Sequence, residues 1–395
     1  MKVFIFSAFD GVPWAGEVSM RYAALTEEFI RNGHEVIYIT SSFSHIRKEF
    51  RKVKDTPSGL KVVLLKTKSY SKNYSIDRFL SYQYLAVSLN NWLNTVSAEP
   101  PPALVIGASP PLETNYVLAK YCRKNDIPFI YDIQDLWPEE FLKFLPAKGV
   151  QRIILKPYFS MAERIVEMST AIVSILSDFL DYYKTQISDK PNSVFHLGTD
   201  TTKYQNVADI FLSDNKMKTV IAMGNSSYGN HLIKLARVVQ HFTDLKLIII
   251  GLNEKSDHIK KRIEKEKLHN IEIIPWMAET EKYSGIPAFN AGVILFAPGS
   301  KYAFPNRAFT YFAAGLPVIN TIRGGELEKC IAENNLGISV NFGEENQMKD
   351  AIEYCLNHFP VQEHQRIQDY AKANFDRADI YKQYYKWAIE IAKDQ

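Results

Sequence analysis

Residues 304–320, which read FPNRAFTYFAAGLPVIN, decide how the second half of the chain folds. Asn306 and Arg307 are polar groups at the start of an apolar helix that ends at Gly315 and leads into a short strand. Residues 323–326 (RGGE) form a second turn that opens another helix. Two helix N-termini that share one strand aim free backbone N–H groups at a common point. We therefore predict a phosphate site, with Arg307 adding donors suited to phosphate oxygens.

Length and composition indicate a globular protein with more than one core. The chain has 395 residues, of which 46% are hydrophobic and 23% are charged. That length favours two domains, and the composition excludes a mainly disordered chain. The three cysteines are far apart and match no metal or disulfide spacing, which predicts reduced thiols in a cytoplasmic protein. The apolar runs are too short to span a membrane, and the N-terminal run lacks the long apolar region of a signal peptide.

The first half alternates strands and helices in the manner of a parallel, doubly wound sheet. A strand over residues 2–8 is followed by a polar turn, a helix over 17–32 and a second strand over 35–40. The pattern predicts further strands at 60–65, 103–107, 128–133, 171–176 and 193–197, with helices at 112–124 and 177–187.

A second alternation of the same kind follows a polar linker at residues 198–214. Its predicted strands lie at 218–223, 245–250, 271–274, 291–296, 317–320 and 337–340, with helices at 232–242 and 257–267. A last helix, 373–395, is expected to cross back onto the first domain. We therefore predict an α/β protein with one domain over 1–200 plus 376–395 and another over 201–375.

A basic segment lies between residues 41 and 90. Although the formal net charge of the chain is only +3, this segment carries ten lysines and arginines against three acidic residues, with tyrosines interleaved. Such a segment could rest on anionic lipid headgroups or form a solvated loop, and both interpretations stay open. Binding to nucleic acid is not expected, because no recognition motif accompanies the basic residues.

The candidate site residues lie in the polar turns that follow predicted strands, because ligands of open α/β sheets bind at the carboxyl ends of the strands. Asp135 directly follows a strand, so it could hold a sugar hydroxyl, accept a proton or act as a helix N-cap. No metal-binding spacing, phosphate-binding Walker loop or serine with a nearby base is present. The first-half candidates are Gly16, Glu17, Ser109, Asp132, Gln134, Asp135 and Trp137. The second-half candidates are Gly224, Asn225, Ser227, Trp276, Pro305, Asn306, Arg307, Thr310, Gly324, Gly325 and Glu326.

In order and spacing, these motifs resemble the family 4 glycosyltransferases of the GT-B fold. Within that family they are similar to bacterial enzymes of capsule and O-antigen assembly, including N-acetylfucosaminyl-type transferases. The resemblance covers nearly the whole chain and rests on Gly16 with Arg21, GHEV at 33–36, SPP at 109–111, DIQDLWP at 132–138, LGTD at 197–200, PNR at 305–307, AGLPVI at 314–319 and GGE at 324–326.

The resemblance implies two Rossmann-like domains that face a central cleft. It implies retaining transfer of a sugar from a nucleotide sugar, UDP-linked, bound by the second domain, to a lipid-linked saccharide on the first. We predict catalytic roles for Gln134, Asp135 and Arg307. The resemblance implies no metal, because helix ends and basic side chains stabilise the departing diphosphate. Surface polysaccharide synthesis at the inner face of the cytoplasmic membrane is the expected setting.

The sequence departs from the family pattern at several positions. The two glutamates usual near the donor sugar and the ribose fall at Tyr302 and Thr310, and the usual basic pair of the second domain is replaced by Asn225 and residues 229–230. The first-domain histidine falls near Gln134. An alternative is therefore a catalytically weak or inactive nucleotide-sugar-binding partner subunit, and a third candidate is another GT-B enzyme such as a nucleotide-sugar epimerase.

Overall fold

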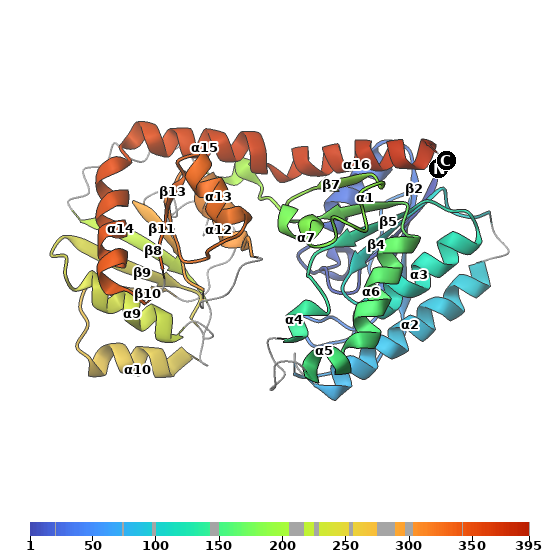
Figure 1. Ribbon diagram of the computed structural model, residues 1–395, viewed down its shortest axis with the longest axis horizontal. Helices are drawn as coiled ribbons and strands as arrows, with labels where there is room; N and C mark the ends of the chain where they lie inside the picture. Colours follow the sequence, from blue (N-terminus) through green and yellow to red (C-terminus); the bar gives the residue numbers. More distant parts are fainter. Residues whose placement is uncertain are drawn as a thin grey trace. The chain divides into compact units, whose positions relative to one another are not determined.

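The computed structural model shows a chain divided into two compact units (Figure 1). It describes residues 1–19, 21–72, 75–96, 100–142, 150–204, 217–224, 229–252, 256–274, 289–296, 303–341 and 343–394. The first unit comprises Met1–Leu197 together with Ala378–Gln395, and the second comprises Gly198–Arg377. The last helix of the chain therefore belongs to the unit that the N-terminus begins.

The described part of the first unit contains a seven-stranded parallel sheet in the order β3-β2-β1-β4-β5-β6-β7. Its apolar strands are buried, as expected for a parallel sheet covered on both faces. The order places β1 and β4 side by side at the point where the winding reverses, which is where such sheets bind ligands. The strands are β1 Lys2–Phe6, β2 Glu35–Ser41, β3 Leu60–Leu65, β4 Leu104–Ser109, β5 Phe129–Ile133, β6 Ala171–Ser174 and β7 Asn192–Val194.

Helices cover both faces of this sheet. One face packs against α1 (Tyr22–Arg31) and the C-terminal α16 (Arg377–Lys393), whose apolar residues share one core with alternate residues of the strands. Helices α2 (Ile76–Val96), α3 (Leu112–Lys124) and α6 (Lys156–Met168) pack beside one another in a second layer (Figure 1). The shorter helices are α4 Glu139–Leu142, α5 Val150–Ile154 and α7 Ser177–Tyr182.

The described part of the second unit contains a six-stranded parallel sheet in the order β10-β9-β8-β11-β12-β13. One face packs against α9 (Gly229–Val239), α10 (Asp257–Lys265) and α14 (Glu345–His358). Helix α12 (Asn306–Ala313) packs against α15 (Val361–Phe375) through aromatic rings. The remaining elements are β8 Lys218–Met223, β9 Leu245–Ile250, β10 Ile271–Ile274, β11 Ala291–Ile294, β12 Val318–Asn320, β13 Gly337–Ser339 and α13 Glu326–Glu333.

The predicted fold class is confirmed, because both units are Rossmann-like parallel sheets covered by helices. Several boundaries differ. The first helix begins at Tyr22 rather than at residue 17, because residues 13–15 form a 3-10 turn and the Asp10 carboxylate caps the helix instead. Asp10 Oδ2 accepts hydrogen bonds from the backbone N–H of Tyr22 at 2.8 Å and of Arg21 at 3.3 Å. A cap eleven to twelve residues upstream cannot be seen in a local sequence pattern.

The last helix of the sequence prediction is in fact two helices. Helix α15 ends at Phe375, Asp376 is extended, and α16 then begins. The Asp376 carboxylate accepts hydrogen bonds from the backbone N–H and the hydroxyl of Thr201, and residue 376 also pairs with Thr199 in a β-bridge. These bonds replace those that a continuous helix would have made.

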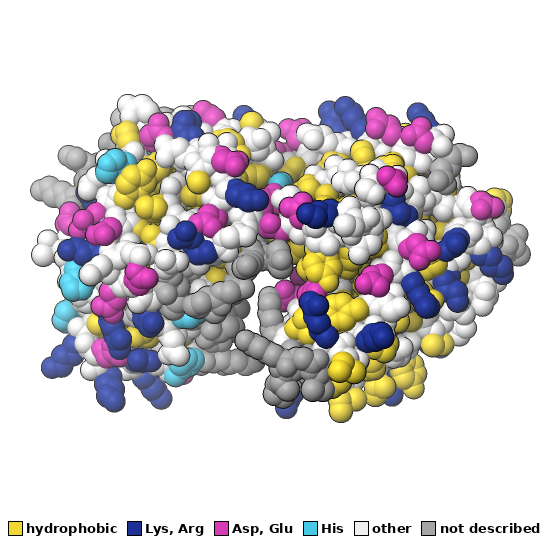
Figure 2. Space-filling model, in the orientation of Figure 1, with side chains coloured by type: hydrophobic (Ala, Val, Ile, Leu, Met, Phe, Trp, Pro, Cys, Tyr) yellow, Lys and Arg dark blue, Asp and Glu magenta, His cyan; other side chains and the backbone are white. Residues whose placement is uncertain are grey.

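The basic segment at residues 41–90 is not a solvated loop throughout, because it contains β3 and the 21-residue helix α2. Arg51 is buried in an ion pair with Glu17. Helix α2 exposes a stripe of apolar residues, Ile76, Phe79 and Val87, which are 78%, 43% and 60% exposed. Figure 2 shows hydrophobic side chains gathered with lysines and arginines over the part of this unit where Figure 1 places α2 and α5.

A buried ion pair and its hydrogen bonds join four distant segments of the first unit. The Arg21 guanidinium, 1% exposed, donates to both oxygens of Asp132, which is fully buried, at 2.9 and 3.1 Å. Arg21 also donates to the Phe195 carbonyl at 2.6 Å, and the Tyr384 hydroxyl on α16 donates to Asp132 at 3.1 Å. Burial alone would lower the pKa of Arg21, but the Asp132 carboxylate raises it well above its usual value.

We expect the Arg21→Met substitution to destabilise the first unit by about 3–5 kcal/mol, because it leaves the Asp132 carboxylate buried without its counter-charge. Urea unfolding followed by circular dichroism measures the change. The matched control is Arg123→Met, which breaks an ion pair whose side chains are 63% and 70% exposed and should cost less than about 1 kcal/mol. Equal effects of the two substitutions would contradict the prediction. If Arg21→Met does not fold, Tyr384→Phe removes a single hydrogen bond to the same carboxylate and should cost about 1.5–3 kcal/mol.

Candidate functional site

The stretch at residues 304–320 folds at the carboxyl edge of the second sheet. Helix α12 begins at Asn306 after Pro305, which is extended, and β12 follows at Val318. Asn306 is exposed, whereas Arg307 is half-buried. The structure thus places the start of an apolar helix beside the ends of the central strands, where the sequence analysis placed it.

Arg307 fastens the start of α12 to the strand ends. Its guanidinium donates to the Met223 carbonyl at 2.7 Å and to the Leu295 carbonyl at 3.1 Å, and it lies 4.9 Å from the centre of the Phe296 ring. Met223 ends β8, and Leu295 directly follows β11. A side chain predicted to bind phosphate is therefore also a structural clamp between a helix and two strands.

Tyr311 also holds α12 against β8, and the sequence analysis did not single it out. Its hydroxyl accepts a hydrogen bond from the Met223 N–H at 2.8 Å and lies 3.4 Å from the Ile221 carbonyl. Its ring covers Gly292 so closely that a Cβ atom there would lie 2.5 Å from the ring. Burial raises the pKa of Tyr311 to about 12. The one signal in the sequence for this contact was a tyrosine in an apolar helix together with a glycine in a neighbouring strand.

A small hollow lies beneath this helix start. It brings together two predicted site residues, Gly224 and Arg307, from segments more than 80 positions apart in the chain. Its other walls are the apolar residues Ala222, Met223, Leu232, Val293 and Leu295. Because it lies at the carboxyl ends of β8 and β11, it occupies the position where an open parallel sheet binds its ligand.

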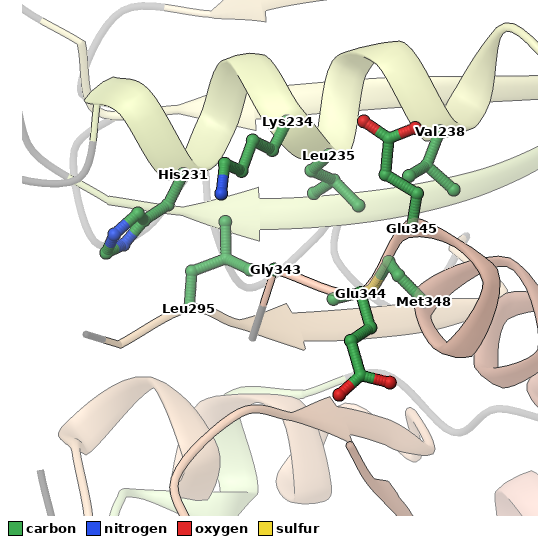
Figure 3. Close-up of a pocket in the computed structure, with 9 residues that line it drawn as sticks. All are labelled: His231, Lys234, Leu235, Val238, Leu295, Gly343, Glu344, Glu345 and Met348. Carbon is green, nitrogen blue, oxygen red and sulfur yellow. The ribbon is translucent and has the colours of Figure 1, made fainter. Parts of the chain in front are cut away.

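Leu295 also lines a second hollow, between α9 and α14 (Figure 3). Leu235, Val238 and Met348 form its apolar wall. The side chains of His231 and Lys234 come from α9, and those of Glu344 and Glu345 come from the start of α14. The rim therefore carries charges of both signs.

Thr310 lies one turn into α12, at the position where the family pattern has a carboxylate. Its side chain is half-buried, and its hydroxyl donates to the Asn306 carbonyl of its own helix at 3.4 Å. A neutral hydroxyl held in this way presents no charge to a ligand. The geometry therefore keeps open the alternative that the sequence analysis drew from this position.

The second predicted turn already holds an anionic group of the protein. The Glu328 carboxylate accepts the Gly324 N–H at 2.5 Å and pairs with the Arg323 guanidinium at 2.5 Å. Gly324 has a φ of +75°, a conformation that favours glycine. Gly325 is buried in extended backbone, and Glu326 begins α13. Glu328 was not among the candidates, although an acid within the first turn of a helix was a visible signal.

In the first unit, two candidates support the loop after β1. Gly16 has a φ of +74° and ends the 3-10 turn. Glu17 is buried, accepts the Val12 N–H at 3.0 Å and pairs with Arg51 at 3.0 Å. Burial alone would raise the pKa of Glu17, but the Arg51 guanidinium and other donors lower it below its usual value. The carboxylate is therefore held inside the loop.

The candidates at the ends of β4 and β5 occupy different environments. The Ser109 hydroxyl is buried and accepts from the Tyr131 hydroxyl at 2.9 Å. The Asp132 carboxylate lies in the buried ion pair and not at an open surface. The Gln134 amide donates to the Tyr22 hydroxyl at 2.5 Å. Asp135 is exposed at the carboxyl edge of the sheet, so it is the acid of this group that a ligand can reach.

Trp137 is buried between the rings of Tyr82 and Phe141, with ring centres 5.6 and 4.4 Å away. Its buried ring therefore contributes to the wall of the carboxyl edge. Four positions of the sequence analysis, Asn225, Ser227, Trp276 and Tyr302, lie outside the described residues.

Two kinds of feature are absent from the described residues. No helix among them combines the length and the apolar character needed to cross a bilayer. Across the same ranges, no group of three or more histidine, cysteine, aspartate or glutamate side chains is arranged to hold a metal ion.

Comparison with known proteins gives one family match, in the second half of the chain. Residues 219–358 match the family described as "Glycosyl transferases group 1". No curated protein matches the chain. The matched residues all lie within the second unit.

Solved structures share the fold over the whole chain. Sucrose-phosphate synthase from Thermosynechococcus elongatus aligns with a TM-score of 0.74 at 13% identity and covers 100% of both chains. Anabaena HepE in complex with UDP-glucose aligns with a TM-score of 0.64 at 12% identity, covering 99% of both chains. WaaG, a glycosyltransferase involved in lipopolysaccharide biosynthesis, aligns with a TM-score of 0.64 at 14% identity, covering 98% of this chain and 99% of the other. The GT-B fold and the family domain together support a glycosyltransferase.

We expect Tyr311→Phe to lower the free energy of unfolding of the second unit by about 1–3 kcal/mol, because the buried Met223 N–H loses its acceptor. Urea unfolding measures this change. The control is Tyr354→Phe, which removes the hydroxyl of a half-buried tyrosine on α14. A loss for Tyr311→Phe no larger than that for the control would show that the hydroxyl does not hold α12.

Proposed function

We propose that the protein transfers a sugar from a UDP-linked nucleotide sugar to a lipid-linked saccharide acceptor, with retention of configuration, in surface polysaccharide synthesis. The observation that carries the proposal is the carboxyl edge of the second sheet, where the start of α12, Arg307 and Gly224 meet beside the turn before α13. Two structures of the similar protein Anabaena HepE are complexes with UDP-glucose and with UDP, which supports a uridine nucleotide as the donor's carrier.

On the donor side, the proposed chemistry is stabilisation of the departing diphosphate. The positive end of the helix dipole favours an anion at the start of α12. Arg307 adds a full positive charge next to that helix start. Its clamp to the Met223 and Leu295 carbonyls keeps it in one orientation, so little reorganisation is needed as charge develops on the leaving oxygen. The proposal includes no metal ion.

On the acceptor side, we assign Asp135 and Gln134 to the reacting hydroxyl. Asp135 is exposed directly after β5, and Gln134 is held by the Tyr22 hydroxyl. A carboxylate at this edge can orient the acceptor hydroxyl or receive its proton, and the amide can hold a neighbouring hydroxyl. Asp132 acts behind them, since its ion pair with Arg21 fixes the end of β5.

The alternative is a partner subunit that binds a nucleotide sugar without turnover. Thr310 supports it, because this neutral side chain cannot grip ribose hydroxyls as a carboxylate does. Glu328 supports it too, because its carboxylate already occupies the Gly324 N–H. An epimerase, the third candidate, would interconvert free donor without acceptor.

A panel of nucleotide sugars distinguishes these functions, with UDP-N-acetylfucosamine first because of the family resemblance. We expect one UDP-sugar to raise the melting temperature of the protein, because a ligand that binds only the folded state stabilises it. The same donor should glycosylate a prenyl diphosphate-linked saccharide, detected by mass spectrometry. Binding without product would favour the partner subunit, and the absence of binding across the panel would reject the proposal.

We expect Arg307→Ala to weaken UDP binding by about 1.5–3 kcal/mol, because it removes a charge-assisted hydrogen bond to the diphosphate. Isothermal titration calorimetry measures the affinity. Tyr311→Phe is the matched control, since it loosens the same helix without removing a charge. An equal loss of affinity in both variants would mean that Arg307 acts only by positioning α12.

We also propose that the first unit rests on an anionic membrane surface through the apolar stripe of α2, namely Ile76, Phe79 and Val87, and the nearby basic residues. Ile153 and Ile154 on α5 are also exposed, by 73% and 62%. An exposed apolar face flanked by cations matches the interface of an anionic bilayer.

Sedimentation with vesicles tests this contact. We expect binding to phosphatidylglycerol vesicles that weakens with salt and falls at least fivefold in the Ile76→Glu/Val87→Glu double variant. Met217→Glu is the control, because Met217 is an exposed apolar residue of the second unit. Vesicle binding that changes neither with salt nor with the double substitution would show that the apolar stripe does not contact the membrane.

A further inference from the structure

A cluster of basic and aromatic side chains lies at the carboxyl edge of the first sheet, and of its members only Trp137 was among the candidates considered so far. Its members follow β1, β2, β3 and β5, of which β3, β2 and β1 are adjacent in the sheet. Ligands of open parallel sheets bind at this edge. We define the basic–aromatic cluster as Phe9, His45, Lys48, Tyr70, Arg78, Tyr82 and Trp137.

Lys48 contacts the Tyr70 ring and the His45 imidazole of the cluster. Its ammonium group lies 4.6 Å from the centre of the Tyr70 ring and 3.5 Å from His45 Nδ1. The Tyr70 hydroxyl and His45 Nδ1 are 2.7 Å apart. Lys48 has a φ of +59°, a backbone conformation that non-glycine residues adopt at a cost and that occurs often at functional sites.

Arg78 supplies the second cation. Its guanidinium carbon lies 5.4 Å from the Phe9 ring centre, 5.5 Å from that of Tyr82 and 5.8 Å from that of Trp137, so three rings fix its position. Its backbone N–H donates to the Ser75 hydroxyl, which places it in the first turn of α2. A cation at that end opposes the helix dipole, so helix stability does not explain it.

Positive charges act on His45 and Lys48 from within the cluster. Burial, and then the charges of Arg78, Lys48 and Arg51, lower the pKa of His45 to about 4. Burial and the charge of Arg78 also lower the pKa of Lys48. Arg51 is matched by Glu17. The carboxyl group near Tyr82 is Glu113, whose pKa is raised by burial and which accepts from Gln83 and Tyr158.

We propose that the basic–aromatic cluster binds the phosphate of the acceptor, with the phosphoryl oxygens between Lys48 and Arg78 and the attached sugar ring against Phe9. Two cations held side by side are relieved by an anion between them. Phe9, His45, Lys48 and Arg78 are all partly exposed, so a ligand can reach them. This inference rests on the proposed function, because it names the chemical class of that acceptor as a phosphorylated sugar.

Calorimetry with the full chain and glucose 1-phosphate as the probe tests the site. We expect binding to the wild type at least tenfold tighter than that of glucose, because the phosphate makes the difference. Lys48→Met and Arg78→Gln should each weaken the binding of the probe at least tenfold. Lys52→Met is the control from the same segment, and its exposed side chain predicts unchanged affinity.

Control measurements distinguish the loss of the phosphate site from misfolding of a variant and from failure of the proposed transfer. Near-ultraviolet circular dichroism shows whether Arg78→Gln folds, and Lys48→Met, at a half-exposed position, serves if it does not. Unchanged probe affinity in both variants, or equal affinity for glucose and glucose 1-phosphate, would overturn the inference. Failure of the nucleotide-sugar panel with intact probe binding would reject the proposed transfer and leave the phosphate site standing.

A competition experiment distinguishes the two sources of the phosphate. Farnesyl phosphate in detergent micelles is added to the complex with glucose 1-phosphate. Displacement that is lost in Lys48→Met assigns the site to a lipid-linked phosphate. Retention of the probe assigns it to a soluble sugar phosphate. Both results support the site, whereas displacement that Lys48→Met leaves unchanged would contradict it.

Discussion

The buried ion pair between Arg21 and Asp132 is the interaction on which the first unit depends. It connects the start of α1 to the end of β5, and through Tyr384 and the Phe195 carbonyl it also holds α16 and the segment after β7. Because both charges are almost wholly removed from water, either one alone would be costly. The C-terminal helix is thereby part of the unit that the N-terminus begins. The same bonds fix the end of β5 at the carboxyl edge of the sheet.

In the second unit, hydrogen bonds to strand ends hold the helix at the carboxyl edge in place. Arg307 and Tyr311 tie α12 to carbonyl and N–H groups of β8 and to the residue after β11. These bonds set where the helix start points, and with it the direction of its dipole. Residues that look like ligand groups in the sequence therefore have a structural role as well. Glu328 is a further example, since its carboxylate holds the turn that was predicted to receive phosphate.

The two carboxyl edges differ in the charge that remains near the surface. In the second unit, Thr310 is neutral and Arg323 is matched by Glu328. In the first unit, Lys48 lies against the Tyr70 ring, Arg78 lies against the Trp137 ring, and Asp135 is exposed after β5. The first edge thus has the charges to recognise a phosphorylated sugar, while the second relies on a helix start and one arginine.

Much of the fold could be predicted from the sequence. The apolar runs identified β8, β9 and β10 with the observed bounds, and α3 as well. Helix α2 was missed, because its apolar residues are spread around the helix and part of them face outward, so no single face stands out. The break at Asp376 was also missed, because the bonds that stabilise it come from Thr199 and Thr201.

The sequence by itself determined the two-sheet architecture and the position of α12, because the periodicity of strands and helices is a local pattern. The class of enzyme was indicated by the resemblance of its motifs, in their order along the chain, to a known family. Only the tertiary structure decided which polar residues belong to the interior. Asp132, Glu17 and Arg51 are charged residues that a sequence places at the surface by default, yet they are buried in pairs with partners 34 to 111 positions away. The physical reason is that a buried charge needs a counter-charge in space, and the sequence does not show which distant segment supplies it.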